Sequence, residues 1–172
     1  MATTTWNVDA AHSEIGFKVK HMMISTVKGA FEDFNATVTA ESDDFTNAKF
    51  GFTAKIDGIN TRNKDRDAHL KSEDFFNADA YPEMRFTSKS YDGETLVGDL
   101  TIKDVTKEVS LDMDFNGVAV DPYGQTKAGF EISGKVNRKD FGLTWSAVTE
   151  AGSIVVSDTI QMAIDLQFIK ES

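Results

Sequence analysis

The chain contains three histidines, His12, His21 and His69, the residues that a metal site would use first. Zinc and related ions need ligands that converge, and these ligands usually have helical or hairpin spacing. His12 and His21 are nine residues apart with a predicted strand between them, and His69 lies in a predicted helical segment. No two of them match a metal-ligand motif, so we expect neither a metal nor another cofactor.

His21 has a second interpretation as a ligand contact. It extends the alternation of Ile15, Phe17 and Val19, which predicts that its side chain faces the inside of the fold at one end. In that position it can bond the polar head group of a bound molecule. A structural hydrogen bond explains the same placement, and the sequence favours this structural role over the ligand contact. His12 is expected to hold a loop.

Only four arginines can bind an anion with a two-pronged guanidinium group: Arg62, Arg66, Arg85 and Arg138. If a ligand carries a phosphate head group, Arg62 or Arg66 is the candidate residue, and we place Arg66 first. The alternative is that Arg66 pairs with a nearby carboxylate and pins a helix to the rest of the fold. The sequence favours this structural role.

Catalytic patterns are missing from the sequence. There is no cysteine, which excludes a thiolate nucleophile, a disulfide and a cysteine-based metal site. There is no Gly-x-Ser-x-Gly turn, and the paired acids Asp43-Asp44 and Glu73-Asp74 read as solvated turns and caps. The net charge of -10 disfavours nucleic acid as a partner. We therefore expect a protein that is not an enzyme.

The elements that position these residues are strands, because apolar and polar residues alternate across most of the chain. Eight strand-like segments can be placed: Glu14–Met22, Val27–Ala40, Ala48–Asp57, Met84–Tyr91, Thr95–Lys103, Val109–Phe115, Ala128–Val136 and Ile160–Phe168. Asp92-Gly93 and Asp121-Pro122-Tyr123-Gly124 predict tight turns between neighbouring segments. The pattern predicts an all-β fold, an eight-stranded antiparallel barrel formed by a single domain over residues 1–172.

Two segments depart from simple alternation. Within Val27–Ala40 the inward parity changes between Phe31 and Phe34, which predicts a bulge in one long strand. The segment from Asn63 to Asn77, between the third and fourth strands, is charged and predicts one or two short helices, with Asn63 and Ser72 as N-caps. Its apolar residues, Leu70, Phe75 and Phe76, are expected to pack against the barrel.

An eight-stranded barrel is either filled by its own side chains or holds one small ligand. Three inward glycines, Gly29, Gly98 and Gly134, favour a partly empty tube, although glycines at barrel corners explain the same pattern. An apolar tube of this kind suits a long-chain amphiphile. The predicted channel residues are Phe17, Val19, Phe31, Phe34, Phe50, Phe52, Phe86, Leu100, Leu111, Met113, Phe115, Phe130, Ile132, Met162 and Ile164.

Several motifs together resemble the YceI-like family of polyisoprenoid-binding proteins, in order and in spacing over nearly the whole chain. They are Trp6 to Ser13, Phe17 to Met22, Val27 to Phe31, Thr61 to Phe76 with Tyr81-Pro82, Gly98 to Ile102 with Val105 to Lys107, and Arg138 to Leu143. The chain departs from the family pattern at Val156-Ser157-Asp158, where a Gly-Asp pair is usual. This departure puts one local turn in question.

The resemblance implies a lipocalin-like barrel with an elongated apolar channel, a bound isoprenoid, isoprenoid quinone or similar amphiphilic lipid, and no catalytic activity. The alternatives are an enzyme acting on such a lipid and a packed barrel that serves as a protein-interaction module. No apolar run is long enough for a transmembrane segment. The N-terminus lacks a signal-peptide pattern, which favours a cytoplasmic protein, unless a signal has been cleaved. A homodimer is compatible with the sequence.

Overall fold

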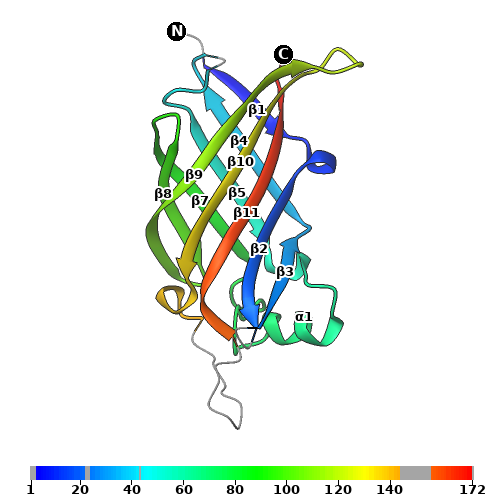
Figure 1. The fold of residues 1–172 in the computed structure, drawn as a ribbon, viewed down its shortest axis with the longest axis vertical. Coiled ribbons are helices and arrows are strands. Elements are labelled where there is room, and N and C mark those ends of the chain that lie inside the picture. Colours follow the sequence, from blue (N-terminus) through cyan, green and yellow to red (C-terminus); the bar gives the residue numbers. More distant parts are fainter. Residues whose placement is uncertain (1–2, 22–23, 43, 144–155, 172) are drawn as a thin grey trace.

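The computed structural model describes residues 3–21, 24–42, 44–143 and 156–171, without the side chains of His21 and Val156. It is an antiparallel β-barrel with one α-helix near one end (Figure 1). The strands are β1 Thr4–Val8, β2 Glu14–His21, β3 Ser25–Phe31, β4 Phe34–Ala40, β5 Lys49–Lys55, β6 Ile59–Asn60, β7 Glu83–Tyr91, β8 Thr95–Ile102, β9 Val105–Val120, β10 Thr126–Asn137 and β11 Val156–Lys170. The helices are α1 Lys64–Lys71 and the short 3-10 helices η1 Ala10–His12, η2 Ile56–Gly58 and η3 Arg138–Phe141.

The barrel closes through β1, which pairs with β4 on one side and with β11 on the other. Trp6 and Asn7 belong to both ladders; Trp6 lies opposite Val38 in β4 and opposite Lys170 in β11. The closed ring runs β1-β4-β5-β7-β8-β9-β10-β11, and β2, β3 and β6 continue three of these strands beyond short interruptions. The predicted eight-stranded antiparallel lipocalin-like barrel is confirmed. Among the described residues, no helix is long and apolar enough to cross a membrane.

One predicted strand is divided in two. Instead of a single bulged strand over Val27–Ala40, the chain forms β3 and β4 with a bend at Glu32 and Asp33 between them. The bend is held by backbone hydrogen bonds, from Glu32 N to Gly58 O at 2.8 Å and from Lys55 N to Asp33 O at 2.8 Å. The change of parity between Phe31 and Phe34 therefore marks a break between two strands.

The helical prediction is confirmed for its first part. Asn63 caps α1, because its side-chain oxygen accepts a hydrogen bond from the backbone N–H of Arg66 at 3.0 Å. The second predicted N-cap, Ser72, is wrong, since Ser72 is the C-cap of α1 and turns follow it. Its hydroxyl donates to the carbonyl of His69, which satisfies an acceptor at the end of the helix.

Aromatic side chains fill the barrel around the β1 closure. Phe130 is 1% exposed, and its ring centroid lies 5.0 Å from that of Phe45, 5.1 Å from that of Phe115 and 5.2 Å from that of Phe50. We call this group the aromatic plug; its members are Trp6, Phe45, Phe50, Phe115, Phe130 and Phe168. Tilted and edge-on pairs at these distances are favourable in addition to their burial.

The inward glycines make room for neighbouring side chains. A Cβ atom on Gly98 would lie 2.5 Å from Cζ of Phe86, 2.6 Å from the carbonyl oxygen of Thr87 and 2.8 Å from Cα of Ser88. Gly29 and Gly134 are covered in the same way, by Phe17 and by Leu111. At these positions the space that glycine leaves is occupied.

We predict that Gly98→Ala lowers the free energy of unfolding by about 1–3 kcal/mol, because the new methyl group meets backbone atoms that cannot move aside. Gly129→Ala is the matched control, since its Cβ would lie 3.7 Å from the nearest side-chain atom and its cost is expected to stay within about 0.5 kcal/mol. Urea unfolding of both variants measures the difference. Equal losses would contradict the close contact over Gly98.

Lys127 ties the N-terminal segment to the β9–β10 turn. Its Nζ lies 2.9 Å from Asp9 and 3.3 Å from Asp121, and all three side chains are about 15% exposed or less. The hydrogen bond with Lys127 lowers the pKa of Asp9 and raises the pKa of Lys127. The pKa of Asp121 is lowered mainly by the backbone N–H of Gln125, with a smaller contribution from Lys127.

These directions give a pH-dependent prediction for Lys127→Met. The lowered pKa values of Asp9 and Asp121 stabilise the fold above their unfolded value of 3.8, and this contribution is lost as the pH falls through the folded values. The raised pKa of Lys127 adds stability that is present below 10.5 and lost above it. The loss of unfolding free energy caused by Lys127→Met is therefore expected to be larger at pH 7 than at pH 3. A loss of the same size at both values would refute the prediction.

Candidate functional site

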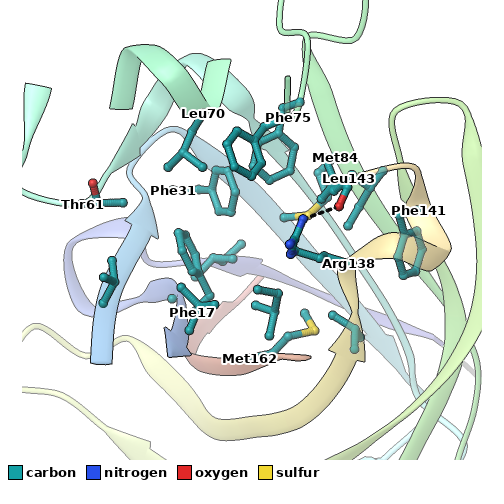
Figure 2. Close-up of a pocket in the computed structure, with 18 of the residues that line it drawn as sticks. Phe17, Phe31, Thr61, Leu70, Phe75, Met84, Arg138, Phe141, Leu143 and Met162 are labelled. Carbon is teal, nitrogen blue, oxygen red and sulfur yellow. Dashed lines mark hydrogen bonds between the residues drawn. The ribbon is translucent and has the colours of Figure 1, made fainter. Parts of the chain in front are cut away.

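A cavity of about 260 Å³ lies inside the barrel at the end where α1 and η3 are found (Figure 2). Its wall comes from β2 and β3, from β7 and β8, and from β10 and β11. Leu70 of α1, with Phe75 and Phe76 of the segment that follows, covers one side. The packing of these three side chains against the barrel agrees with the expectation from the sequence.

The predicted channel residues divide into two groups in the structure. Five of them line the cavity: Phe17, Val19, Phe31, Leu100 and Met162. The other ten belong to the packed core or its edge and do not line the cavity: Phe34, Phe50, Phe52, Phe86, Leu111, Met113, Phe115, Phe130, Ile132 and Ile164. The cavity therefore occupies one part of the barrel and does not run along its whole length.

Several lining residues are not among the predicted channel residues. Met84 and Ile102 lie near the ends of β7 and β8, and Phe141 and Leu143 lie on or next to η3. All four are at most 6% exposed. The sequence did contain a signal for two of them. Phe141 and Leu143 belong to the Arg138–Leu143 motif, which lies in a connection between strands and could have marked them as cavity residues.

Arg66 is held at the rim of the cavity by Thr61. Its Nε donates to the hydroxyl oxygen of Thr61 at 2.8 Å, and its Nη2 donates to the Thr61 carbonyl at 2.6 Å. The Thr61 hydroxyl and backbone N–H both donate to one carboxylate oxygen of Asp67, at 2.5 Å and 2.9 Å. Arg66 thus joins α1 to the end of β6 through Thr61, and within the described residues it has no ion pair with a carboxylate.

Arg138 is a buried cation in the cavity wall, with 2% of its side chain exposed. Its Nη1 donates to the carbonyl of Leu143 at 2.6 Å, and its Nε donates to the carbonyl of Ser157 at 3.0 Å. Burial lowers the pKa of Arg138, and the charge of Asp158, whose carboxylate lies 3.7 Å away, acts in the opposite direction. Arg138 therefore joins η3 to the beginning of β11.

The histidines occupy separate places. His69 lines the cavity, with Nε2 at 2.9 Å from the carboxylate of Asp74 and its ring centroid 5.1 Å from that of Phe75. His12 lies on η1, with Nδ1 at 2.8 Å from Asp9, and does not line the cavity. The predicted role of His21 falls on a side chain outside the described part. In the described part of the chain no three acidic or histidine side chains gather as a metal site.

Three permanently charged residues line the cavity, Lys20, Arg66 and Arg138, and all three are cations; His69 also lines it. No carboxylate is among the described lining residues, although Asp and Glu outnumber Lys and Arg by 28 to 18 in the whole chain. The remaining wall is almost entirely apolar. The cavity can therefore accept an apolar group.

Comparisons with known proteins agree with this architecture. The family model of the YceI-like domain matches residues 6–168 of the sequence. A UPF0312 protein of Staphylococcus epidermidis is 38% identical over 166 residues, which covers 96% of this chain and 97% of that protein. The crystal structure of the YCEI protein of Campylobacter jejuni superposes with a TM-score of 0.74 at 39% identity and covers 95% of this chain and 96% of that one.

A more distant structure shares the fold. A polyisoprenoid binding domain from Saccharophagus degradans, implicated in plant cell wall breakdown, superposes with a TM-score of 0.73 at 12% identity and covers 96% of this chain and 98% of that one. With closely related sequences over nearly the whole chain and a family model matched from Trp6 to Phe168, the protein belongs to the YceI-like domain family.

Proposed function

We propose that this protein is a non-catalytic binding protein that carries an amphiphilic lipid, an isoprenoid or a related molecule, with the apolar part of the lipid in the cavity. The proposal rests on one observation, a cavity of about 260 Å³ inside the closed barrel that is lined mostly by apolar side chains. Each methylene moved from water into such a space gains about 0.8 kcal/mol. The ligand class is drawn from the polyisoprenoid binding domain that shares the fold.

The polar groups of the cavity support binding without catalysis. Among the described lining residues the only hydroxyl belongs to Thr61, and it is already bonded to both Asp67 and Arg66. His69 contacts the carboxylate of Asp74 and the edge of the Phe75 ring. This arrangement offers a ligand hydrogen-bond donors, while the Thr61 hydroxyl is held between Asp67 and Arg66 as part of the contact that joins α1 to β6.

The first experiment is native mass spectrometry of the purified protein, followed by solvent extraction and reloading with isoprenoid and fatty ligands. We expect a mass increment that extraction removes and that saturates at one ligand per chain. An extracted protein that takes up no amphiphile would overturn the proposal. A ligand recovered with an altered mass would instead indicate an enzyme that acts on it.

A pair of variants connects uptake to the cavity. Val136→Phe fills part of the lining and is expected to reduce uptake, whereas Val120→Phe changes an exposed residue of β9 and is expected to leave uptake unchanged. Equal uptake by both variants, with both correctly folded, would place the ligand elsewhere on the protein.

A further inference from the structure

We propose that the outer face of the barrel beside the cavity docks on an anionic lipid surface, with four lysines at the head groups and Ile24 inserted next to them. The lysines are Lys18 and Lys20 of β2, Lys28 of β3 and Lys135 of β10, and we call them the basic face. Docking itself does not depend on the proposed function, whereas its use for loading or delivering a lipid rests on that function.

Strand pairing places three of these lysines in one row across four strands. Lys28 lies opposite Lys18. On the other side of β2, Gln161 of β11 lies opposite Lys18 and also opposite Lys135. Neighbouring strands are about 4.8 Å apart, so the row is about 14 Å wide. Lys20 lies on the same side of β2 as Lys18, two residues nearer the end of the strand. Lys18 is half-buried and the other three lysines are exposed, so the row presents a patch of positive charge to solvent.

The basic face lies on the outside of the cavity wall. Val19 and Val27 lie opposite each other on β2 and β3, and both line the cavity. Their sequence neighbours include Lys18, Lys20 and Lys28, and consecutive residues of a strand point to opposite faces of the sheet. A surface that contacts these lysines is therefore separated from the cavity by the thickness of one sheet.

The lysines of the basic face form no ion pair with another described residue. Lys20 Nζ donates to the hydroxyl of Thr26 at 3.0 Å, which is a neutral partner. The lysines that do pair with carboxylates within the described residues are Lys89, Lys127 and Lys139. Lysines that lie directly opposite each other in a ladder also repel. Because acidic residues outnumber basic ones by 28 to 18 in this chain, a face that keeps its cations away from carboxylates is suited to an anionic surface outside the protein.

The carboxylates on this side of the barrel lie in a separate row. Across β2, β11, β10 and β9 the row consists of Glu14, Asp165, Glu131 and Asp114. Glu14 is four residues before Lys18, so the two rows are about 13 Å apart. This distance exceeds the Debye length, which is about 10 Å at 0.1 M salt. The basic face can therefore attract an anionic surface locally, although the net charge of the chain is -10.

Ile24 adds an apolar anchor beside the lysines. It directly precedes β3 and is 82% exposed. The end of β2 and the start of β3 lie at the same end of the barrel as α1 and the cavity (Figure 1). The other large apolar side chains exposed among the described residues are Val118, Val120 and Tyr123, which belong to β9 and its turn at the opposite end. An apolar side chain flanked by lysines suits the interface of a membrane, which favours a lipid surface over an acidic protein as the partner.

Docking is tested by sedimentation of the protein with sucrose-loaded vesicles of phosphatidylcholine alone or of phosphatidylcholine and phosphatidylglycerol in equal parts. At about 0.1 M salt we expect the protein to sediment with the vesicles that contain phosphatidylglycerol and to stay in solution with the others. Raising the salt to about 1 M is expected to release it. Equal binding to both compositions, or binding that salt does not weaken, would overturn the proposal.

A charge-matched pair of double variants locates the contact. Lys18→Gln with Lys28→Gln is expected to lower the vesicle partition coefficient about 25-fold, since each lysine near an anionic surface contributes about fivefold. Lys49→Gln with Lys89→Gln changes the net charge by the same amount on β5 and β7, across the barrel from β11, and is expected to lower the coefficient less than about twofold. Equal losses would show that total charge decides the binding and that the basic face is not the contact.

The anchor is tested with a second matched pair. Ile24→Ser is expected to weaken vesicle binding about tenfold, because the apolar area of an isoleucine no longer leaves water. Val120→Ser removes an exposed apolar side chain at the opposite end of the barrel and is expected to leave binding unchanged. If Ile24→Ser binds the vesicles as tightly as the unchanged protein, the insertion of Ile24 is wrong.

The two proposals fail in different ways. If the extracted protein takes up amphiphiles and does not bind anionic vesicles, docking is wrong and the lipid-binding function stands. If it binds polyglutamate instead of the vesicles, docking is also wrong, and the basic face is a contact for an acidic protein. If it binds the vesicles and takes up no amphiphile, docking stands and the proposed function is wrong.

Discussion

Phe130→Ala is expected to lower the free energy of unfolding by about 3–5 kcal/mol, because Phe130 is the centre of the aromatic plug. The side chain is 1% exposed, and four other rings contact it. The close packing of several rings limits collapse around the missing side chain, so a cavity remains and its cost adds to the lost burial. Urea unfolding followed by circular dichroism measures the loss.

Two comparisons make this prediction specific. Tyr123→Ala removes a side chain that is 90% exposed and is expected to change the unfolding free energy by no more than about 0.5 kcal/mol. Phe130 does not line the cavity, so folded Phe130→Ala is expected to take up an amphiphilic ligand as the unchanged protein does. A loss below about 1 kcal/mol for Phe130→Ala would show that the plug is loosely packed.

Arg138→Met is the second large effect, with an expected loss of about 2–5 kcal/mol of unfolding free energy. The carbonyls of Leu143 and Ser157 both accept hydrogen bonds from Arg138, and methionine removes the donors while keeping much of the volume. A buried carbonyl without a donor costs about 1–3 kcal/mol. The loss is measured by chemical unfolding at neutral pH.

Arg85→Met is the matched control for Arg138→Met. Arg85 is 61% exposed, and its ion pair with Glu83 spans 3.6 Å, so its removal is expected to cost less than about 1 kcal/mol. If both substitutions cost the same, the hydrogen bonds of Arg138 contribute no more than an exposed ion pair does.

The sequence allowed most of the barrel to be predicted, because strand alternation and turn residues are local signals. Gly93 has φ +100°, and Asp92 accepts hydrogen bonds from the backbone N–H groups of Glu94 and Thr95, as the Asp-Gly turn requires. Asn63 caps the helix as expected. The change of parity between Phe31 and Phe34 indicated an irregularity, but the prediction of a bulge was wrong because the structure has a break between β3 and β4. A bulge and a break change the parity in the same way, so the sequence does not distinguish them.

The position of the cavity could not be predicted from alternation. Alternation shows which residues face inward and does not show at which depth of the barrel the interior is filled. Gly98 and Gly134 illustrate the difficulty, because inward glycines suggested empty space and neighbouring side chains occupy it. Phe45 adds to the plug from the connection between β4 and β5, with φ 60°, and no strand pattern indicates its placement.

The cations of the site were predictable only in part. The structural role predicted for Arg66 was partly right, since Arg66 joins the helix to the barrel, but its partner is Thr61 and the carboxylate of Asp67 is one step further away. Arg138 follows directly after β10, where an arginine is usually solvated. Its burial depends on η3 folding back so that the Leu143 carbonyl faces the guanidinium group, which is a tertiary contact.

The overhang of β9 has a consequence for solubility. Thr95, the first residue of β8, pairs with Asp112 of β9. In the described part of the chain, the residues of β9 that follow Asp112 pair with β10 and have no paired strand on the side of β8. The end of β9 therefore presents an open backbone edge with Val118 and Val120 exposed, a surface on which another strand can grow the sheet. The net charge of -10 keeps such edges apart by mutual repulsion, and salt weakens this protection. The acidic surface is thus expected to reduce edge-to-edge aggregation.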